Sequence, residues 1–324
     1  MSPRHALAAL AALVLPAVAG SALAQAWPAK PITLVVGSAP GSAPDVYSRT
    51  IAEPMGRLLG TTVLVDNRAG ANANIAAEFV ARAPADGHAL WVPAQSQMEI
   101  NPSAYADLRW KPADFVAILK GVEAPLVLVV HPSVPAKTLP ELAAHVRANP
   151  GKLSYASFSP GTLSHFIAHQ LNEKLGMDLP HLPFKGSGPQ VQALLGGHVG
   201  VGFTQVNTGL AHVQAGKLQA LAVTGAKRWR QLPEVPTLAE LGHAELTATT
   251  WFGLVARAGT PAPVVQRLIE SAVRAHTEPG TRERLEQMGF DVSAQSGAEF
   301  AASLREGEAR WAKVVRATGF RAAN

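Results

Sequence analysis

The 324-residue chain contains no cysteine. It can therefore form no disulfide, and it offers no thiolate nucleophile, no cysteine ligand for a metal and no cysteine for a lipid anchor. Charged residues make up only 16% of the chain, and the lysines and arginines that give a formal charge of +5 are scattered along it. Their densest cluster is Lys227–Arg230, so the charge pattern does not predict nucleic-acid binding.

No long hydrophobic run is present either. The longest near the start is the uncharged stretch of residues 6–18, which follows Arg4 and His5 and precedes small residues up to Ala26. It falls well short of the roughly 20 apolar residues that span a bilayer, and its flanks have the order of a secretory signal. We expect a signal peptide over residues 1–26, cleaved after Ala24 or Ala26, and an exported protein.

Strand-like and helix-like segments alternate through the remaining residues, which is typical of parallel sheets flanked by helices. No low-complexity linker separates two consecutive halves. Apolar runs at 126–130 and 251–255 suggest two crossings between lobes. We therefore expect an α/β protein in which residues 27–127 plus 250–324 form a discontinuous lobe 1 and residues 128–249 form lobe 2.

The segments expected from these patterns are the following. Strands are predicted at 32–36, 62–66, 89–92, 126–130, 153–157, 199–203, 219–223 and 251–255. Helices are predicted at 44–59, 73–82, 138–148, 163–175, 188–195, 208–215, 237–241, 261–275, 279–288 and 297–317.

One short pattern occurs twice: an apolar run, then Pro-Gly-Ser or Pro-Gly-Thr, then a helix-like segment. Residues 32–36 lead into Pro40–Ser42, the first turn, and residues 153–156 lead into Pro160–Thr162, the second turn. Such a turn presents free backbone N–H groups at the positive end of a helix dipole, where a carboxylate binds well. Because ligands of open α/β sheets lie beyond the carboxyl ends of the strands, both turns should face one cleft.

In the first turn, the N–H groups of Gly41, Ser42 and Ala43 are candidate donors to a carboxylate. Alternatively Ser42 caps the helix while Pro44 fills its first position, and both roles can coexist. Asp45 lies in the first helical turn, where the dipole favours an acid. It would also repel a bound anion, so a structural role and direct binding both remain open.

The second turn and two strand ends supply further candidates. Around the second turn these are Ser159, Gly161, Thr162, Ser164 and His165, unless they merely cap a helix. Gln95 and Ser96 follow the strand at 89–92, and Thr204 and Gln205 follow the strand at 199–203, where they either contact ligand or form loop surface. Residues 185–188 lack the spacing of a nucleotide-binding glycine loop, and we expect a plain turn there.

His165 and His169 share the i,i+4 spacing of a metal-binding pair. A zinc-protease motif would need glutamate where Phe166 stands, and no carboxylate follows nearby. We therefore expect a capping or solvated histidine pair, with neither a metal nor a cofactor.

A series of short motifs follows in order along the whole chain: Trp27–Ile32, Asp45 after the first turn, Asp66–Ala71, Pro84–Gly87, Asn101–Tyr105, Pro135–Leu139, Pro150–Leu153, Pro183–Gly186, Ala215–Leu218 and Leu232–Thr237. Together they resemble the tripartite tricarboxylate transporter receptor family, also called the Bug or TctC family. The resemblance implies a two-lobe periplasmic-binding-protein (Venus flytrap) fold, type II-like. It also implies a periplasmic receptor that grips a small carboxylate between the two turns and delivers it to membrane permease subunits.

Three positions depart from the family pattern. Ser42 replaces a usual glycine, Asn72 replaces a common glycine, and Thr204 stands where many members carry aspartate. Loss of that acid removes a partner for a ligand ammonium group. We therefore favour a carboxylate without an amine.

The function expected is transport binding by a monomer, with no enzymatic activity and no nucleic-acid partner. An enzyme would need a nucleophile and a base, but the neighbours Ser164 and His165 point about 100° apart on a helix, and no Gly-x-Ser-x-Gly elbow exists. A sensor that docks to a membrane kinase instead of a permease remains an alternative.

Overall fold

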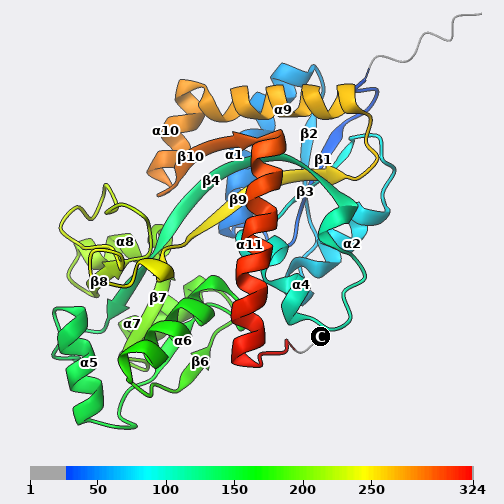
Figure 1. Ribbon diagram of the computed structural model, residues 1–324. Helices are drawn as coiled ribbons and strands as arrows, with labels where there is room; N and C mark the ends of the chain where they lie inside the picture. Colours follow the sequence, from blue (N-terminus) through cyan, green and yellow to red (C-terminus); the bar gives the residue numbers. More distant parts are fainter. Residues whose placement is uncertain (1–26, 323–324) are drawn as a thin grey trace, which may run out of the picture.

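The computed structural model describes residues 27–322 (Figure 1), so the predicted signal peptide lies outside the described residues. The strands are β1 (Ile32–Val36), β2 (Val63–Asn67), β3 (Ala89–Val92), β4 (Phe115–Val130), β5 (Tyr155–Ser157), β6 (His181–Pro183), β7 (Val201–Gln205), β8 (Gln219–Val223), β9 (Thr249–Arg257) and β10 (Asp291–Ser296). The α-helices are α1 (Ala43–Leu59), α2 (Asn74–Arg82), α3 (Gln95–Glu99), α4 (Asn101–Ala104), α5 (Leu139–Ala148), α6 (Leu163–Leu175), α7 (Ser187–Leu195), α8 (Val206–Gln214), α9 (Ala262–Thr277), α10 (Pro279–Gln287) and α11 (Gly297–Thr318). Within the described part of the chain, no helix combines the length and apolarity of a membrane span.

The strands form a mixed sheet in the order β2-β1-β3-β9-β4-β7-β5-β6, with β8 and β10 also pairing with β4. β1 pairs in parallel with β2 and β3, and β5 pairs in parallel with β6 and β7. The pairs that join these groups, β3 with β9, β9 with β4 and β4 with β7, are antiparallel. The expectation of parallel sheets is therefore correct at the two ends and wrong in the middle.

β4 explains this arrangement because one strand of 16 residues serves both lobes. Its first part pairs with β9 and β10, and its last part, Leu126–Val130, pairs with β7 and β8. Only that last part was predicted as strand. Lys120, Gly121 and Glu123 interrupt the apolar pattern of the first part. Lys120 and Glu123 nevertheless pair with both β9 and β10, while Gly121 lies at a register shift in the pairing with β9.

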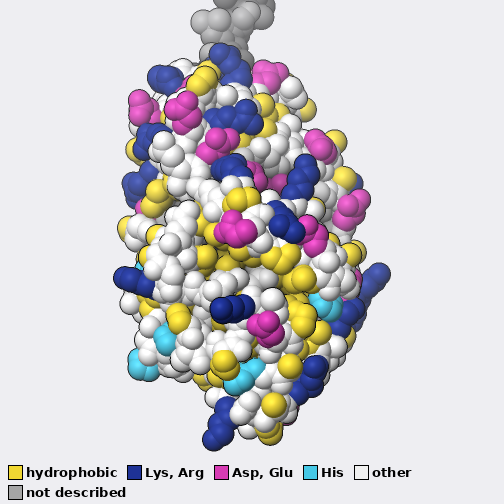
Figure 2. Space-filling model, turned by 90° about the vertical axis from the view of Figure 1, so that its left-hand side faces the viewer, with side chains coloured by type: hydrophobic (Ala, Val, Ile, Leu, Met, Phe, Trp, Pro, Cys, Tyr) yellow, Lys and Arg dark blue, Asp and Glu magenta, His cyan; other side chains and the backbone are white. Residues whose placement is uncertain are grey.

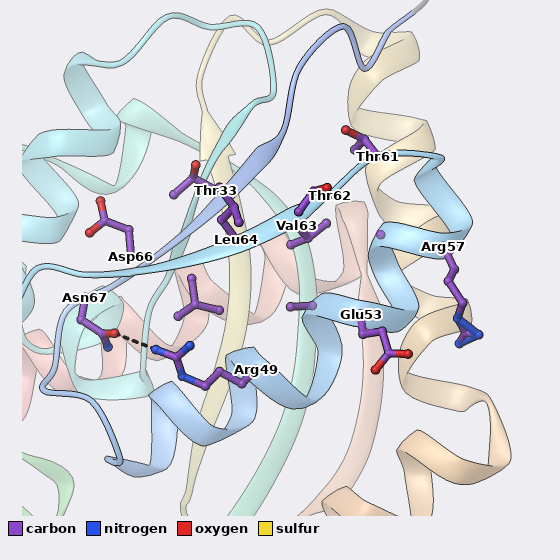
Figure 3. Close-up of a pocket in the computed structure, with 13 residues that line it drawn as sticks. Thr33, Arg49, Glu53, Arg57, Thr61, Thr62, Val63, Leu64, Asp66 and Asn67 are labelled. Carbon is purple, nitrogen blue, oxygen red and sulfur yellow. Dashed lines mark hydrogen bonds between the residues drawn. The ribbon is translucent and has the colours of Figure 1, made fainter.

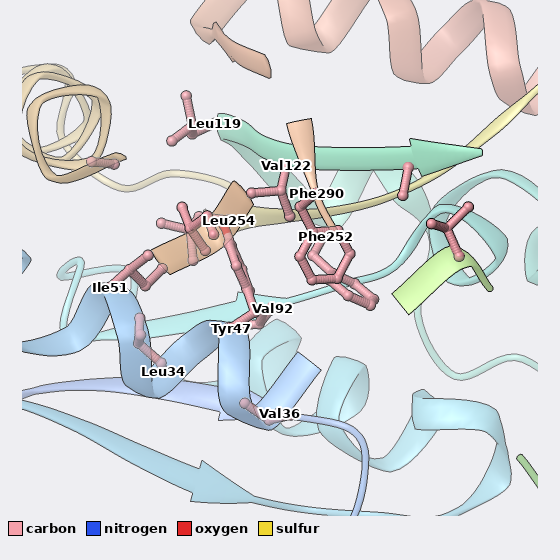
Figure 4. Packing of buried hydrophobic residues seen from close by; sticks show 14 of the residues in the cluster. Leu34, Val36, Tyr47, Ile51, Val92, Leu119, Val122, Phe252, Leu254 and Phe290 are labelled. Carbon is pink, nitrogen blue, oxygen red and sulfur yellow. The ribbon is translucent and has the colours of Figure 1, made fainter. Parts of the chain in front are cut away.

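The core of lobe 1 forms where α1 packs on the sheet (Figure 4). Tyr47, Ile51 and Met55 recur every four residues on α1, so they share one helix face and are all fully buried. They pack among strand residues such as Leu34 and Phe252. The Tyr47 hydroxyl lies 2.9 Å from His276 Nε2, so the polar end of this buried ring is also satisfied.

The last helix, α11, contributes to the cores of both lobes. Near its start Phe300 packs edge-on against Trp251, with ring centroids 5.3 Å apart. Further along, Trp311 and Val315 join the core of lobe 2, and beyond the helix Phe320 packs edge-on against Phe166. Figure 1 shows the helix running down past both halves of the molecule. We therefore propose that its second half belongs with lobe 2, although the boundaries predicted above place it in lobe 1.

Some predicted segments differ from the structure. Residues 237–241 form a bridge residue and turns instead of a helix, because Thr237 pairs with Val223 and the following residues turn back. β10 is a strand of alternating polar character, and β6 has only three residues, so neither produces an apolar run. Short strands of this kind are defined by their neighbours in the sheet and not by local pattern.

Candidate ligand-binding site

A cleft of about 960 Å³ is lined by residues from both lobes. Its walls are Gly37, Pro44, Ala69–Asn72, Ala94, Ser96, Gln97, Thr250 and Phe252 on one side, and Phe158–Pro160, Thr162, Pro183–Gly186 and Gln205 on the other. A hollow of about 610 Å³ beside the first turn shares Pro44, Phe158, Gly186 and Gln205 with it. We treat the two as one cleft. Figure 2 shows hydrophobic side chains gathered across the middle of one face, with charged side chains mainly above and below.

The predicted site residues divide into two groups. Those that line the cleft are Gly41, Ser42, Ala43, Ser96, Ser159, Thr162 and Gln205. Those that do not are Asp45, Gln95, Gly161, Ser164, His165 and Thr204. The second group supports the walls instead of forming them, as their contacts show.

In the first turn, Gly41 adopts the left-handed φ of +79° and its N–H donates to Asp45 Oδ2 at 2.8 Å. The Ser42 N–H donates to the Ala39 carbonyl at 3.2 Å. Neither N–H is therefore free, which corrects the expectation that the amides of Gly41 and Ser42 face a ligand. Asp45 is only 2% exposed and also accepts hydrogen bonds from Arg49 and Asn67. Burial alone would raise the pKa of Asp45, but the hydrogen bonds from Arg49, Gly41 and Asn67 together lower it. Asp45 thus has the structural role of closing the turn.

Ser42 is the N-cap residue of α1 by its backbone, but its side chain makes no capping hydrogen bond. Instead its Oγ lies 2.6 Å from Ser38 Oγ. The helix begins at Ala43, one residue before the predicted start at Pro44. The N–H of the first helical residue has no intrahelical acceptor, and Ala43 lines the hollow beside the first turn, so we propose its N–H as a backbone donor to a ligand.

The second turn repeats this geometry with a different side chain. Gly161 has a φ of +71°, and its N–H donates to His165 Nδ1 at 3.2 Å. The His165 ring stacks on His181, with centroids 4.0 Å apart and planes at 7°. Burial lowers the pKa of His165 to about 3, with smaller contributions from His181 and His169. His165 is thus a neutral acceptor that closes the turn.

The hydroxyl groups around the second turn bond mainly to one another and to backbone. Thr162 Oγ1 donates to the Ser159 carbonyl at 2.7 Å and lies 3.1 Å from Ser164 Oγ. Ser164 is fully buried and accepts the Phe158 N–H at 3.2 Å. Ser164 and His165 therefore serve separate partners, as expected from their directions on the helix.

The strand-end candidates also separate. Ser96 lines the cleft, whereas Gln95 is buried and donates to Glu99 Oε2 at 2.7 Å. Thr204 is fully buried beside Thr208, with hydroxyl oxygens 3.2 Å apart, and Gln205 lines the cleft. Each pair therefore places one side chain toward the cleft and one into the interior.

The sequence model described as the tripartite tricarboxylate transporter family receptor matches residues 47–320, which is most of the chain. The chain belongs to this family. BugT of Bordetella pertussis is a relative of this receptor, 32% identical over 304 residues that cover 93% of each chain. The resemblance found in the sequence motifs is thereby confirmed.

Solved structures agree with the two-lobe fold of this receptor. The periplasmic binding protein BugD has a TM-score of 0.80 and 32% identity, covering 91% of this chain and 99% of its own. Rpa4515 of R. palustris with adipate has a TM-score of 0.83 at 29% identity, with coverage of 91% and 99%. MatC of Rhodopseudomonas palustris with bound malate has 0.79 and 31%, with coverage of 89% and 100%. The protein is therefore a solute-binding receptor of the periplasmic type.

Sequence reasoning did not identify the apolar and cationic lining of the receptor cleft. Phe158, Phe184 and Phe252 contribute aromatic surface, and the first two directly follow the ends of β5 and β6. Lys185 carries the only charge among the described lining residues, none of which is Asp or Glu. An aromatic residue directly after a strand could have indicated this lining. In the sequence alone, however, such a residue cannot be distinguished from an aromatic residue of the hydrophobic core.

Asn72 shows how the receptor accommodates one departure from the family pattern. Its φ is +50°, within the left-handed region that a glycine adopts without cost. Its Nδ2 donates to Asn101 Oδ1 at 2.9 Å, which holds the loop in this conformation. Asparagine is among the residues that best tolerate this region, so the replacement keeps the loop shape and adds a polar side chain to the lining.

A second hollow of about 960 Å³ lies outside the cleft, between α1 and the edge strand β2 (Figure 3). Charges of both signs line it, including Arg49, Glu53 and Asp66. Arg49 Nη2 donates to Asn67 Oδ1 at 3.2 Å, so this arginine already has a partner there. None of the predicted site residues lies in this hollow, and we do not assign the ligand to it.

Proposed function

We propose that this receptor binds a small carboxylate in the cleft, in the periplasm, and delivers it to the membrane permease of a tripartite tricarboxylate transporter. The observation that supports this most is the charge of the lining: one lysine, no acid, and the N-terminal ends of α1 and α6 beside it. Helix N-termini and a lysine both favour an anion. The bound adipate and malate of the two similar proteins are carboxylates as well.

The magnitudes allow such a ligand to bind without an arginine clamp. Micromolar affinity corresponds to about −8 kcal/mol. Hydrogen bonds to a charged group contribute on the order of 1.5–3 kcal/mol each. Four or five donors, such as the Ala43 N–H and the Lys185 ammonium, are roughly enough after the cost of ordering.

We further propose that the ligand lacks an ammonium group and that the protein acts as a binding monomer without catalysis. An ammonium group would need an acidic or similar partner, and the described lining has none. The Ser164 hydroxyl and the His165 imidazole are held by different groups, so they do not make a nucleophile and base.

Removal of a single backbone N–H donor tests the proposal. Ala43→Pro removes the N–H at the first helical position, which tolerates proline, and the preceding Ser42 already has a compatible extended backbone. We expect carboxylate affinity to fall by about tenfold or more with little loss of stability. Isothermal titration with mono-, di- and tricarboxylates, chosen after a thermal-shift screen, measures this.

Ala43→Gly is the matched control because it keeps the N–H, and its affinity should stay close to that of the native protein. Unchanged affinity in Ala43→Pro would show that the first turn does not contact the ligand. If no carboxylate stabilises the native protein, the substrate class is wrong. Uptake of the identified carboxylate by membranes that contain the permease, with and without the receptor, tests delivery.

A further inference from the structure

A continuous chain of hydrogen bonds joins a buried acid to the cleft. Glu99, at the end of α3, is 7% exposed. Its two carboxylate oxygens accept from Gln95 Nε2 at 2.7 Å and Trp251 Nε1 at 2.9 Å. Gln95 Oε1 in turn accepts from Ser96 Oγ at 3.2 Å, and Ser96 Oγ accepts from the Leu163 N–H at 3.3 Å. Ser96 is the member of this chain that lines the cleft.

The molecule is built to hold the Glu99 carboxylate in place. It lies in a pocket of about 350 Å³, with Lys120 and Glu123 on β4 and Arg310 on α11 among the lining residues. Gly307 of α11 makes the room, because a Cβ at that position would come within 2.3 Å of the carboxyl carbon. Each carboxylate oxygen accepts an N–H, and two cations line the pocket, so the site favours the ionised form of Glu99. Burial raises the pKa of Glu99 to about 6, and these hydrogen bonds, Lys120 and Arg310 oppose that rise.

The ionised acid sets the direction of every hydrogen bond in the chain. A carboxylate only accepts, so the Gln95 amide must turn its NH₂ group toward Glu99 and its oxygen toward Ser96. Ser96 then donates its single proton to that oxygen. Gln95 is 2% exposed, so turning the Ser96 proton elsewhere would leave a buried carbonyl oxygen without a partner.

We infer that Glu99 fixes Ser96 as a hydrogen-bond acceptor in the cleft, so that the receptor selects carboxylates carrying a hydroxyl group. This rests on the proposed function, because it assumes that the cleft binds a carboxylate. A hydroxyl has one proton and two lone pairs. The Ser96 proton goes to Gln95 and one lone pair to Leu163, so the remaining lone pair is all that Ser96 offers a ligand. It repels a carboxylate oxygen and accepts a ligand O–H.

Glu99→Gln should reverse the direction of the hydrogen bonds from position 99 to Ser96, while the side chain keeps nearly the same size. The new amide at position 99 can accept from Trp251 with its oxygen, but it then presents NH₂ toward Gln95. Gln95 must turn its oxygen to position 99 and its NH₂ to Ser96. The Ser96 proton is thereby released to the ligand, and Ser96 becomes a donor.

The test compares matched pairs of acids that differ by one hydroxyl: malate with succinate, 3-hydroxybutyrate with butyrate, and mandelate with phenylacetate. By isothermal titration at pH 7.5, a pH chosen about 1.5 units above the pKa of Glu99, we expect the native protein to bind the hydroxy acid of at least one pair about three- to tenfold more tightly. Glu99→Gln should abolish or invert that ratio while binding the unhydroxylated acid at least as well. A purely structural role would weaken both members of a pair equally.

Two further variants complete the experiment. Glu123→Gln removes an acid from the same pocket without touching the chain, because Glu123 bonds to Lys120 and Thr249, and it should keep the ratio. If Glu99→Gln does not fold, Gln95→Met interrupts the chain between Glu99 and Ser96 and should also remove the preference.

The possible results separate the two proposals. Binding of carboxylates with no hydroxyl preference in the native protein, or a preference that survives Glu99→Gln or Gln95→Met, overturns the role of Glu99 and leaves the proposed function intact. Failure of the native protein to bind any carboxylate overturns the proposed function, and the inference with it.

Discussion

The first and second turns have the same backbone but are closed by different chemistry. In each, a glycine in the left-handed region donates its N–H to a side chain four residues later. At the first turn that side chain is the ionised Asp45, paired with Arg49 at 3.0 Å. At the second it is the neutral His165, stacked on His181 and packed edge-on against Phe320.

The difference shows that either an ionised or a neutral acceptor can close this turn. The buried charge of Asp45 is compensated by hydrogen bonds from Arg49 and Asn67, whereas the neutral His165 ring packs against aromatic neighbours. A neutral acceptor also adds no negative charge beside an anion site. The three predictions below test how far the two turns are equivalent.

The largest difference is expected from valine at the two glycines. At Gly41 a Cβ meets nothing within 4 Å, so Gly41→Val costs mainly left-handed strain, about 2 kcal/mol of unfolding free energy. At Gly161 a Cβ lies 3.0 Å from Phe320 Cε1, so Gly161→Val should cost about 3–4 kcal/mol. Urea unfolding measures both.

Adding Phe320→Ala to each valine variant supplies the control for packing. It should bring the cost at Gly161 close to that at Gly41, because it removes the side chain that the new Cβ meets. Equal costs in the single variants would mean that Phe320 does not confine the second turn.

The second prediction concerns pH. An unfolded histidine takes up a proton below about pH 6.5, but the pKa of His165 in the folded protein is lowered to about 3. Stability from this residue is therefore complete above pH 6.5 and falls as the pH drops, by up to about 1.4 kcal/mol per pH unit. His165→Asn keeps an acceptor and should reduce proton uptake on unfolding near pH 5 by about one.

Asp45→Asn is the comparison for that experiment. The pKa of Asp45 is lowered from 3.8, so its contribution is complete above that value and is lost only in stronger acid. This variant should therefore leave the slope of unfolding free energy between pH 5 and 7 unchanged. His181 and His276, whose pKa values burial lowers to about 4, supply the slope that remains in His165→Asn. A slope that is unaltered in His165→Asn would contradict the neutral assignment.

The smallest effect is expected at Ser42. Because its side chain makes no cap and bonds only to Ser38, Ser42→Ala should cost about 0.5 kcal/mol. Thr162→Val breaks the 2.7 Å bond to the Ser159 carbonyl inside the second turn and should cost about 1–2 kcal/mol. Thermal unfolding of the two variants measures the difference. A loss of about 1–2 kcal/mol in Ser42→Ala would instead indicate a capping side chain.

Much of the fold could be predicted because local pattern and tertiary structure agree. α1 shows this best, since Tyr47, Ile51 and Met55 define one buried face whose spacing is visible in the sequence. The first part of β4 could not be predicted, because its polar residues Lys120 and Glu123 line the Glu99 pocket while their backbones pair with β9 on one side and β10 on the other. Only the partner strands, distant in sequence, explain why that polar segment is extended.

The site could be predicted at the level of its turns, but not of its donors. An acceptor stands four residues after each glycine, Asp45 after Gly41 and His165 after Gly161, and this spacing was visible in the sequence. Only the structure shows that these side chains fold back and accept the glycine N–H groups. Lys185 was assigned to a plain turn, because residues 185–188 lack a known binding motif and the sequence does not indicate where the side chain points. Whether it faces a cleft depends on the opposite lobe.

On the lobe boundaries proposed above, the two ends of the described chain lie on different lobes. Trp27 donates its ring N–H to the Asp86 carbonyl at 2.8 Å on lobe 1, and Phe320 packs on His165 of lobe 2 after α11 has passed the junction. A donor fluorophore attached near residue 27 and an acceptor near residue 320 would therefore report the angle between the lobes directly. The path of the last helix thus offers an optical test of whether the lobes move when a carboxylate binds.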